Sequence, residues 1–369
     1  MGTNIKIHLL NFFFLFLISF HSQADETLIA PEGFKIDVFA SEIQNPRQIA
    51  QGDDGYFFVG SKAGMVYALK DFDNNGVIDF KTIIADDMSD ASGVAFKDGS
   101  LYIAEIDKIW KIDQIEEKIN NYKSSNNIKK VLITDNLPSD EWHGRKWIKI
   151  DLDGSILVNV GAPCNVCLND DQRYASIIRF KEGAWSIEAS GVRNSVGFDW
   201  NPINGKLYFT DNGRDWMGDM IPSCELNVLE DAGDFFGFPY LHAKNIKDPE
   251  FGDRDHGYEI KKPILELGAH VAPTGIEFYK GNSFPETYQN NAFITLHGSW
   301  NSSKKVGYKV IRVMFDLDGK IVGVEDFITG FLEGESVSGR PAAPFSTKDG
   351  SLLISDDYAN KIYKVDYSG

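Results

Sequence analysis

The stretch from Arg145 to Gly161, RKWIKIDLDGSILVNVG, decides the fold of this chain. Apolar residues alternate with polar ones on both sides of Asp153-Gly154, which predicts two strands joined by a tight turn. The theme of strand, turn and strand recurs along the chain in units that begin at Arg47, Ser92, Arg145, Ser195, Thr274 and Pro341. Most of the turns are Asp-Gly or Asn-Gly, which supply the positive φ angles that type I′ hairpins need.

Most of the six units are followed by a further pair of short strands. A repeat of roughly 40–50 residues built from four strands is typical of a propeller blade. We therefore expect an all-β protein, a single six-bladed β-propeller over residues 25–369, whose antiparallel four-stranded blades surround a central channel. Phe34–Ala40 is expected to close the last blade, and Ile115–Tyr122 to form a short helix. Residues 215–270 show no strand rhythm and are predicted to be a long functional loop.

The N-terminus has the pattern of a secretory signal peptide. Lys6 is followed by the apolar run Leu9–Phe20, and Ser22-Gln23-Ala24 offers small residues for cleavage near Ala24. The alternative is an uncleaved membrane anchor, but the run is short for a membrane span. We expect a periplasmic or secreted protein without a stable membrane span after cleavage. The net charge of −17 argues against binding to nucleic acid or anionic membranes.

The three cysteines are Cys164, Cys167 and Cys224. Outside the cytoplasm, Cys164 and Cys167 could form a short-loop disulfide. Zinc binding is the alternative, but no cluster of His or Cys completes four ligands. A c-type haem would require His at position 168, where this chain has Leu168. Cys224 is either a free thiol or a partner of one of the other two.

Four polar residues precede the inner strands of different predicted blades: Arg47, His143, Arg193 and Arg340. In a ring they would point at one pocket. Converging arginines in an acidic protein indicate an anionic ligand such as a polycarboxylate. A histidine at such a position could be a general base, although loop histidines are usually only solvated.

Two further loops carry polar residues, Thr210–Asp215 and His297–Asn301. The first suits an oxygen-seeking ion such as Ca²⁺, and either could be an ordinary polar turn. Asp71–Asp79 matches the first half of an EF-hand loop but has Thr82 at the twelfth position. We therefore expect a plain hairpin turn there rather than a second Ca²⁺ site.

With these motifs in view, the chain resembles the sorbosone dehydrogenase-like branch of the soluble sugar dehydrogenases (glucose and pyranose dehydrogenases) that use pyrroloquinoline quinone (PQQ) and Ca²⁺. The resemblance extends over the mature chain, and six segments carry it in order: His143–Cys167, Gly191–Asn194, Asp211–Asp215, Glu225–Tyr240, His297–Asn301 and Gly339–Pro341. The chain departs from the family at Cys224, where an acidic residue is frequent, and at Leu241, where a cysteine is frequent.

The resemblance implies a six-bladed propeller and a role for each matching residue. His143 matches the general base that takes the proton of the substrate hydroxyl while hydride passes to PQQ. Arg193 matches the residue that polarises the quinone carbonyl, and Asn194 its neighbour at the cofactor. The backbone carbonyls of Gly213 and Arg214 match the ligands of Ca²⁺. Further positions match the residues that hold the carboxylates and ring of PQQ: Arg47, His297, Asn301 and Arg340.

The resulting prediction is an oxidoreductase that oxidises a sugar or a related alcohol or aldehyde. It would pass electrons to an external acceptor, a cytochrome or a quinone. The alternatives are a Ca²⁺-dependent propeller hydrolase such as a lactonase, and a non-catalytic propeller that binds a partner or glycan. A lactonase would need several inward carboxylates around its ion, whereas the candidates here are mostly Arg and His.

Overall fold

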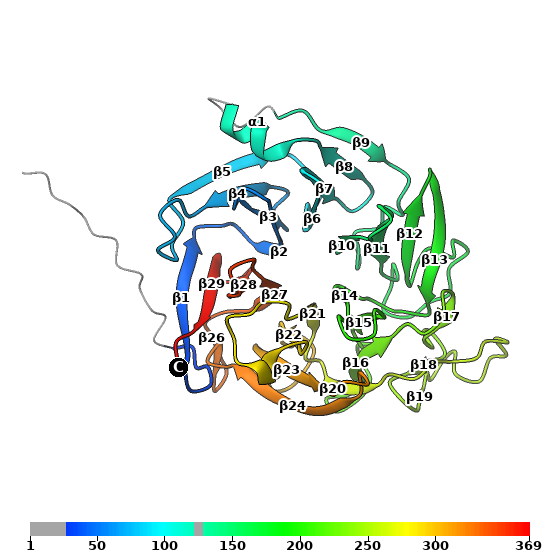
Figure 1. Cartoon of the computed structure of the whole chain (residues 1–369). Helices are drawn as coiled ribbons and strands as arrows, with labels where there is room; N and C mark the ends of the chain where they lie inside the picture. Colours follow the sequence, from blue (N-terminus) through cyan, green and yellow to red (C-terminus); the bar gives the residue numbers. More distant parts are fainter. Residues whose placement is uncertain (1–26, 122–127) are drawn as a thin grey trace, which may run out of the picture.

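The computed structural model describes residues 27–121 and 128–369. These residues form six antiparallel blades of four main strands each, arranged in a ring around a central opening (Figure 1). The fold class expected from the sequence is thus confirmed. The predicted signal peptide lies outside the described residues. Within the described ranges, no helix is long and apolar enough to cross a membrane.

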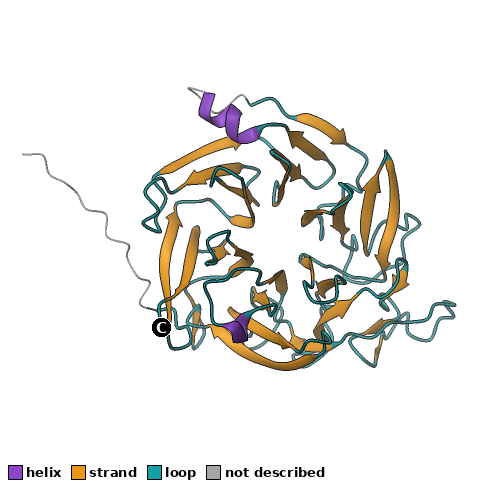
Figure 2. Ribbon diagram, viewed as in Figure 1, coloured by secondary structure: helices purple, strands orange, loops and turns teal. Residues whose placement is uncertain are grey.

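The blades follow the order of the chain, and each runs from the centre of the ring to its rim (Figures 1 and 2). The first blade consists of β2 (Pro46–Gln51), β3 (Phe57–Ser61), β4 (Val66–Lys70) and β5 (Phe80–Ala85). The second consists of β6 (Gly93–Lys97), β7 (Ser100–Ala104), β8 (Ile109–Ile112) and β9 (Val131–Thr134). The third consists of β10 (Ile148–Ile150), β11 (Ile156–Val160), β12 (Ser176–Lys181) and β13 (Ala184–Ser190), with β17 (Asp234–Phe235) added in parallel.

The fourth blade consists of β14 (Phe198–Trp200), β15 (Leu207–Asp211), β16 (Ser223–Val228) and β20 (Leu265–Ala269). The fifth consists of β21 (Pro273–Phe278), β22 (Ala292–Leu296), β23 (Lys309–Phe315) and β24 (Ile321–Ile328). The sixth consists of β27 (Pro341–Ser346), β28 (Leu352–Asp356), β29 (Lys361–Tyr367) and the N-terminal strand β1 (Phe34–Ser41). β1 pairs with β29, so the predicted closure of the last blade is confirmed.

The remaining elements are small. The predicted helix is present as α1 (Ile115–Asn121). A 3₁₀ turn, η2, spans Glu286–Tyr288, and two short hairpins are made by β18 (Leu241–His242) with β19 (Ile246–Lys247) and by β25 (Leu332–Glu333) with β26 (Ser336–Val337). The Asp71–Asp79 segment connects β4 to β5, and three of its carboxylates lie within 4.8 Å of one another.

Only some of the hairpin turns have the predicted type I′ geometry. Asp98 and Gly99 both have positive φ, as a type I′ turn requires, and so do Glu182 and Gly183. At Asp153-Gly154 only the glycine has positive φ. The stretch that predicts the fold therefore uses a different turn, although its register pairs Ile148 with Val158 as the alternation requires.

The hydrophobic core is divided among the interfaces between neighbouring blades. Phe58 and Ile103 pack together between the first two blades, and Leu157 and Phe198 between the third and the fourth. Phe58, Leu157 and Phe198 have no exposed surface. Since such packing fixes each blade against the next, it also fixes the loops at the ends of the inner strands.

The prediction for residues 215–270 was wrong in one respect, because this segment supplies two of the four strands of the fourth blade. β16 and β20 pair with each other, and β16 also pairs with β15. Glu225 and Asn227 of β16 are buried polar residues and break the apolar pattern that would have marked the strand.

Candidate active site

A cavity of about 340 Å³ opens among the loops at one end of the ring. Such a volume lies near the lower end of the range of small-molecule sites, roughly 300–1,000 Å³. Eight residues predicted from the sequence line it: Arg47, His143, Arg193, Asn194, Gly213, His297, Asn301 and Arg340. They converge because the start of an inner strand and the end of the next strand lie at the same end of an antiparallel hairpin.

Arg47 differs slightly from its predicted position, since it is the second residue of β2 rather than the residue before a strand. The pairing of β2 with β3 shifts between Pro46 and Ile49, so Arg47 lies at a β-bulge. A bulge redirects a side chain relative to regular pleating, which is how a strand residue can line the cavity.

His143 is held in one tautomer. Its Nδ1 lies 2.7 Å from the carbonyl oxygen of Ala162, which can only accept, so Nδ1 carries the proton. Nε2 is then unprotonated and accepts a hydrogen bond of 3.1 Å from the indole Nε1 of Trp142. His143 has a positive φ of 54° and packs against Gly161, where a Cβ atom would lie 2.5 Å from that of His143. Glycine is therefore required at position 161.

Burial, together with the nearby charge of Arg193, lowers the pKa of His143 to about 3. The imidazole is thus neutral at physiological pH, with a lone pair on Nε2. Neutrality is the protonation state that a general base needs, while a base with so low a pKa is weaker than one whose pKa lies near the working pH.

Because the pKa of His143 is lowered, the reaction rate should change little as the pH falls from 7 to 5. An ordinary histidine with a pKa of about 6.5 would be mostly protonated at about pH 5, and the rate would fall roughly 30-fold there. We expect kcat/KM of any reaction in which His143 takes the proton to stay within about threefold between pH 7 and pH 5, because His143 remains neutral. A steep loss centred near pH 6.5 would contradict this state of the base.

Arg193 is buried beside His143 and is bonded on every side. Its Nε donates to the carbonyl of Asn165 at 2.9 Å, and its Nη1 donates to Asn212 at 3.2 Å and Gly213 at 2.9 Å. Its Nη2 donates to the side chain of Asn165 at 2.9 Å and to Asp215 at 3.0 Å. A guanidinium has five N–H groups, so all of them have protein acceptors. Arg193 therefore acts in this state as a fixed positive charge.

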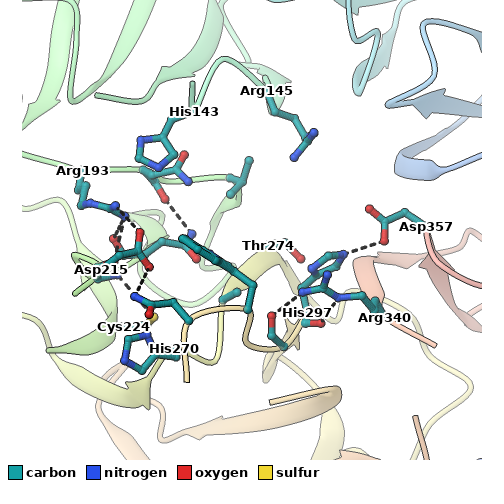
Figure 3. Close-up of a pocket in the computed structure, with 18 of the residues that line it drawn as sticks. His143, Arg145, Arg193, Asp215, Cys224, His270, Thr274, His297, Arg340 and Asp357 are labelled. Atoms are coloured by element: carbon teal, nitrogen blue, oxygen red, sulfur yellow. Dashed lines mark hydrogen bonds and ion pairs between the residues drawn. The ribbon is translucent and has the colours of Figure 1, made fainter. Parts of the chain in front are cut away.

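The opposite side of the cavity is built around Asp357 (Figure 3). Arg47 Nη1 donates to Asp357 at 2.7 Å, and His297 Nε2 lies 2.7 Å from the other carboxylate oxygen. Burial lowers the pKa of His297 to about 4, so this imidazole is neutral and donates from Nε2. Arg340 donates to the backbone carbonyls of His297 at 3.1 Å and Gly298 at 2.6 Å.

Arg47 and Arg340 differ from Arg193 in one respect. Among the described residues, the side chain of Arg47 donates one hydrogen bond and that of Arg340 donates two. Both line the cavity, so both keep N–H groups for a ligand. Five cationic residues line the cavity against three carboxylates, although the whole chain carries a net charge of −17. The cavity is therefore suited to an anion.

Of the two residues predicted at a metal ion, only Gly213 lines the cavity. Its carbonyl accepts from Arg193, but a carbonyl oxygen has two lone pairs and can still bind an ion. The side chain of Arg214 forms an ion pair with Asp248, which also bonds His242.

Several lining residues were not identified from the sequence. Asp357 follows β28 in an ordinary acidic turn, and only the ring places it against Arg47. Arg145 lines the cavity and pairs with Asp90 at 3.1 Å. The position of Arg145 just before an inner strand could have indicated that it lines the cavity.

The three cysteines do not form a metal site. Cys164 and Cys167 are disulfide-bonded, and Cys224 is a buried free thiol.

Comparisons with known proteins agree with this architecture. A protein of Borreliella burgdorferi described as "Uncharacterized protein" is 38% identical over an alignment 369 positions long, which covers 96% of this chain and 95% of the relative. The model of the TrAA12-like family matches residues 240–330.

Two solved structures share the fold. The holo form of the pyranose dehydrogenase PQQ domain of Coprinopsis cinerea has a TM-score of 0.76 at 18% identity, covering 92% of this chain and 97% of that chain. The calcium structure of the Trichoderma reesei enzyme of carbohydrate-active family AA12 has a TM-score of 0.77 at 19% identity, covering 94% and 98%. The resemblance inferred from the motifs is thereby confirmed. The chain belongs to one family with the Borreliella burgdorferi protein, and it has the propeller fold of the soluble PQQ-dependent sugar dehydrogenases, with a TrAA12-like segment in its second half.

Proposed function

We propose that this protein is a PQQ- and Ca²⁺-dependent dehydrogenase that oxidises a sugar or a related alcohol or aldehyde, with His143 as the general base. The observation that carries the proposal is the pairing of a neutral imidazole, whose Nε2 is unprotonated, with a cavity that carries an excess of positive charge. The descriptions of the two structural neighbours, a PQQ domain and a calcium structure, support the choice of cofactors.

The residues of the cavity fit an anionic, planar cofactor. Arg47 and Arg340 would hold its carboxylates through their remaining N–H groups. Asn194 would contact its ring, since Asn194 lines the cavity and its buried Oδ1 has no hydrogen-bond partner in the described structure. His297 and Asn301 complete this set.

The carbonyls of Gly213 and Arg214 would bind Ca²⁺, which prefers oxygen ligands. When bound, PQQ supplies the hydride acceptor, and Ca²⁺ polarises its oxygen atoms.

The protein's own residues perform the proton transfer. The carbonyl of Ala162 fixes the ring of His143, and Nε2 takes the proton of the substrate hydroxyl after the indole N–H of Trp142 has moved away. The positive charge of Arg193 stabilises negative charge that develops in the cavity during the reaction. Trp142 is 52% exposed, so its displacement disturbs little packing.

Reconstitution of the purified protein tests the proposal. PQQ added with Ca²⁺ should bind in equilibrium dialysis and support dye reduction on a panel of aldoses and polyols. Removal of Ca²⁺ with a chelator should abolish the turnover, and Ca²⁺ added back should restore it. Mg²⁺ at the same concentration is the control, because it demands a smaller octahedral site. A protein that binds no PQQ under these conditions would refute the proposal.

The cellular setting is part of the same proposal. A periplasmic or secreted location rests on the predicted signal peptide, and a cytochrome or a quinone would accept the electrons. A Ca²⁺-dependent hydrolase is less well supported, because two of the three carboxylates that line the cavity, Asp215 and Asp357, are already paired with arginines.

A further inference from the structure

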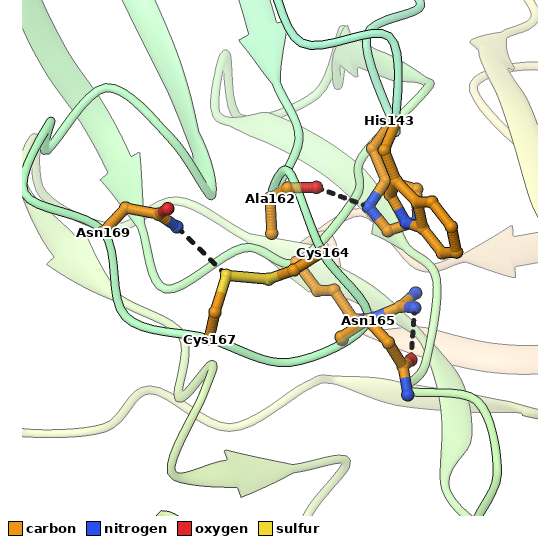
Figure 4. Close-up of a disulfide and its surroundings, with 8 residues drawn as sticks. His143, Ala162, Cys164, Asn165, Cys167 and Asn169 are labelled. Carbon is orange, nitrogen blue, oxygen red and sulfur yellow. Dashed lines mark hydrogen bonds between the residues drawn. A yellow bond between two sulfur atoms is a disulfide. The ribbon is translucent and has the colours of Figure 1, made fainter.

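The short loop closed by the Cys164–Cys167 disulfide lies beside His143, which lines the cavity (Figure 4). It follows β11 and begins beyond Ala162, whose carbonyl fixes His143. The backbone N–H of Ala162 also donates to the carbonyl of Arg193 at 2.8 Å. One short segment therefore contacts both the proposed base and the neighbouring cation.

Asn165, inside this loop, makes the larger part of the contact. Its backbone carbonyl accepts from Arg193 Nε, and its Oδ1 accepts from Arg193 Nη2, both at 2.9 Å. Its Oδ1 also accepts from the backbone N–H of Asp215 at 2.9 Å, and its Nδ2 donates to the carbonyl of Asp215 at 3.1 Å. A single residue thus holds both members of the buried Arg193–Asp215 ion pair.

The chemistry of asparagine suits this position. An amide both donates and accepts, whereas a carboxylate only accepts and an alkyl group does neither. The contacts to Arg193 come from two different parts of Asn165, its backbone and its side chain, so they also fix the plane of the guanidinium. The loop itself must be rigid for this to work, and the disulfide begins one residue before Asn165 and ends two residues after it.

We propose that Asn165 is the positioning residue that fixes the guanidinium of Arg193 relative to His143, and that the Cys164–Cys167 disulfide holds Asn165 in place. The expected loss of kcat rests on the function that we propose for this protein, whereas the expected shift of the Arg193 guanidinium does not. Without the side chain of Asn165, Arg193 keeps its bonds to Asn212, Gly213, Asp215 and the backbone carbonyl of residue 165, but its Nη2 loses the amide oxygen that also binds the backbone N–H of Asp215.

The variant Asn165→Ala tests this inference against Asn169→Ala. Asn169 is an exposed asparagine just beyond the loop, and its amide contacts Cys167 rather than Arg193. With PQQ and Ca²⁺ bound, we expect Asn165→Ala to lower kcat by roughly 10–100-fold, the usual effect of removing a residue that orients a functional group. KM for the sugar should change less than threefold. Asn169→Ala should behave like the wild type.

A second readout needs no cofactor. The charge of Arg193 helps to keep His143 neutral, so its displacement should raise the pKa of His143. Nitrogen NMR of the imidazole at about pH 4.5 should show a neutral ring in the wild type and in Asn169→Ala, and partial protonation in Asn165→Ala. Near-ultraviolet circular dichroism confirms that each variant is folded.

Two more variants separate positioning from simple loss of structure. Asn165→Asp keeps both acceptor contacts of Oδ1 and should recover part of the lost kcat, whereas Cys164→Ser/Cys167→Ser should reproduce part of the Asn165→Ala effect. If the imidazole of Asn165→Ala becomes protonated but wild-type protein shows no turnover with PQQ, the positioning role stands and the proposed function fails. If Asn165→Ala matches Asn169→Ala in both kcat and imidazole protonation, the positioning role is wrong.

Discussion

Replacement of His143 by Gln is expected to lower kcat of the reconstituted enzyme by roughly 10²–10⁴, the range for loss of a general base. The glutamine side chain is uncharged and similar in size to histidine, but its amide cannot accept a proton at neutral pH. Binding of PQQ should remain within a fewfold of the wild type, because Arg340 and Asp357, the partner of Arg47, lie on the opposite side of the cavity (Figure 3). Single-turnover kinetics and equilibrium dialysis measure the two effects separately.

His256→Gln is the matched control. His256 stacks on Phe235 and contacts Tyr240, and it does not line the cavity, so its replacement should leave the rate unchanged. Full activity of His143→Gln would show that another group takes the proton, and the role given to His143 would then be wrong.

The second large effect concerns stability and does not depend on any cofactor. Arg193→Met should reduce the free energy of unfolding by about 3–5 kcal/mol, the usual result of removing one partner of a buried ion pair. Arg193 is 3% exposed and Asp215 is 9% exposed, so the carboxylate would be left largely without water. Urea unfolding at pH 7 measures the loss.

Arg173→Met provides the comparison. Arg173 pairs with Asp171 through both Nε and Nη2, at 3.0 Å and 2.6 Å, but the two side chains are 26% and 37% exposed. Solvent screening limits such pairs to about 0–1 kcal/mol. The double variant Arg193→Met/Asp215→Asn should recover part of the stability, because it removes the unpaired charge. A loss below about 1 kcal/mol for Arg193→Met would mean that Asp215 finds other partners.

The architecture could be predicted because the signals that encode it are local. Alternation around Asp153-Gly154 fixes which side chains face the core, and the same pattern appears once in each blade. The signal failed at β16, where Glu225 and Asn227 are buried in a strand. They are tolerated there because Glu225 accepts hydrogen bonds from Asn227 at 2.9 Å and from the backbone of Ala243 at 2.7 Å, and no local pattern reports such partners.

The candidate site could be predicted where its residues share a register. His143, Arg193 and Arg340 stand at equivalent strand entries, so the sequence indicates that they converge. Asp357 could not be found in this way, because its role depends on a partner that lies 310 residues away in the chain. The bonding of Arg193 was also hidden, since its acceptors are mainly backbone carbonyls, whose direction the sequence does not specify.

The closure of the last blade has a consequence for folding. β1 pairs with β29, so the sixth blade is completed by a strand that precedes the first blade in the sequence. Contacts between residues so far apart in the chain form slowly, because a long loop must be closed first. Arg47 of the first blade and Asp357 beside the sixth also meet over a separation of 310 residues. Ligand binding at this pair thus requires that the ring is closed.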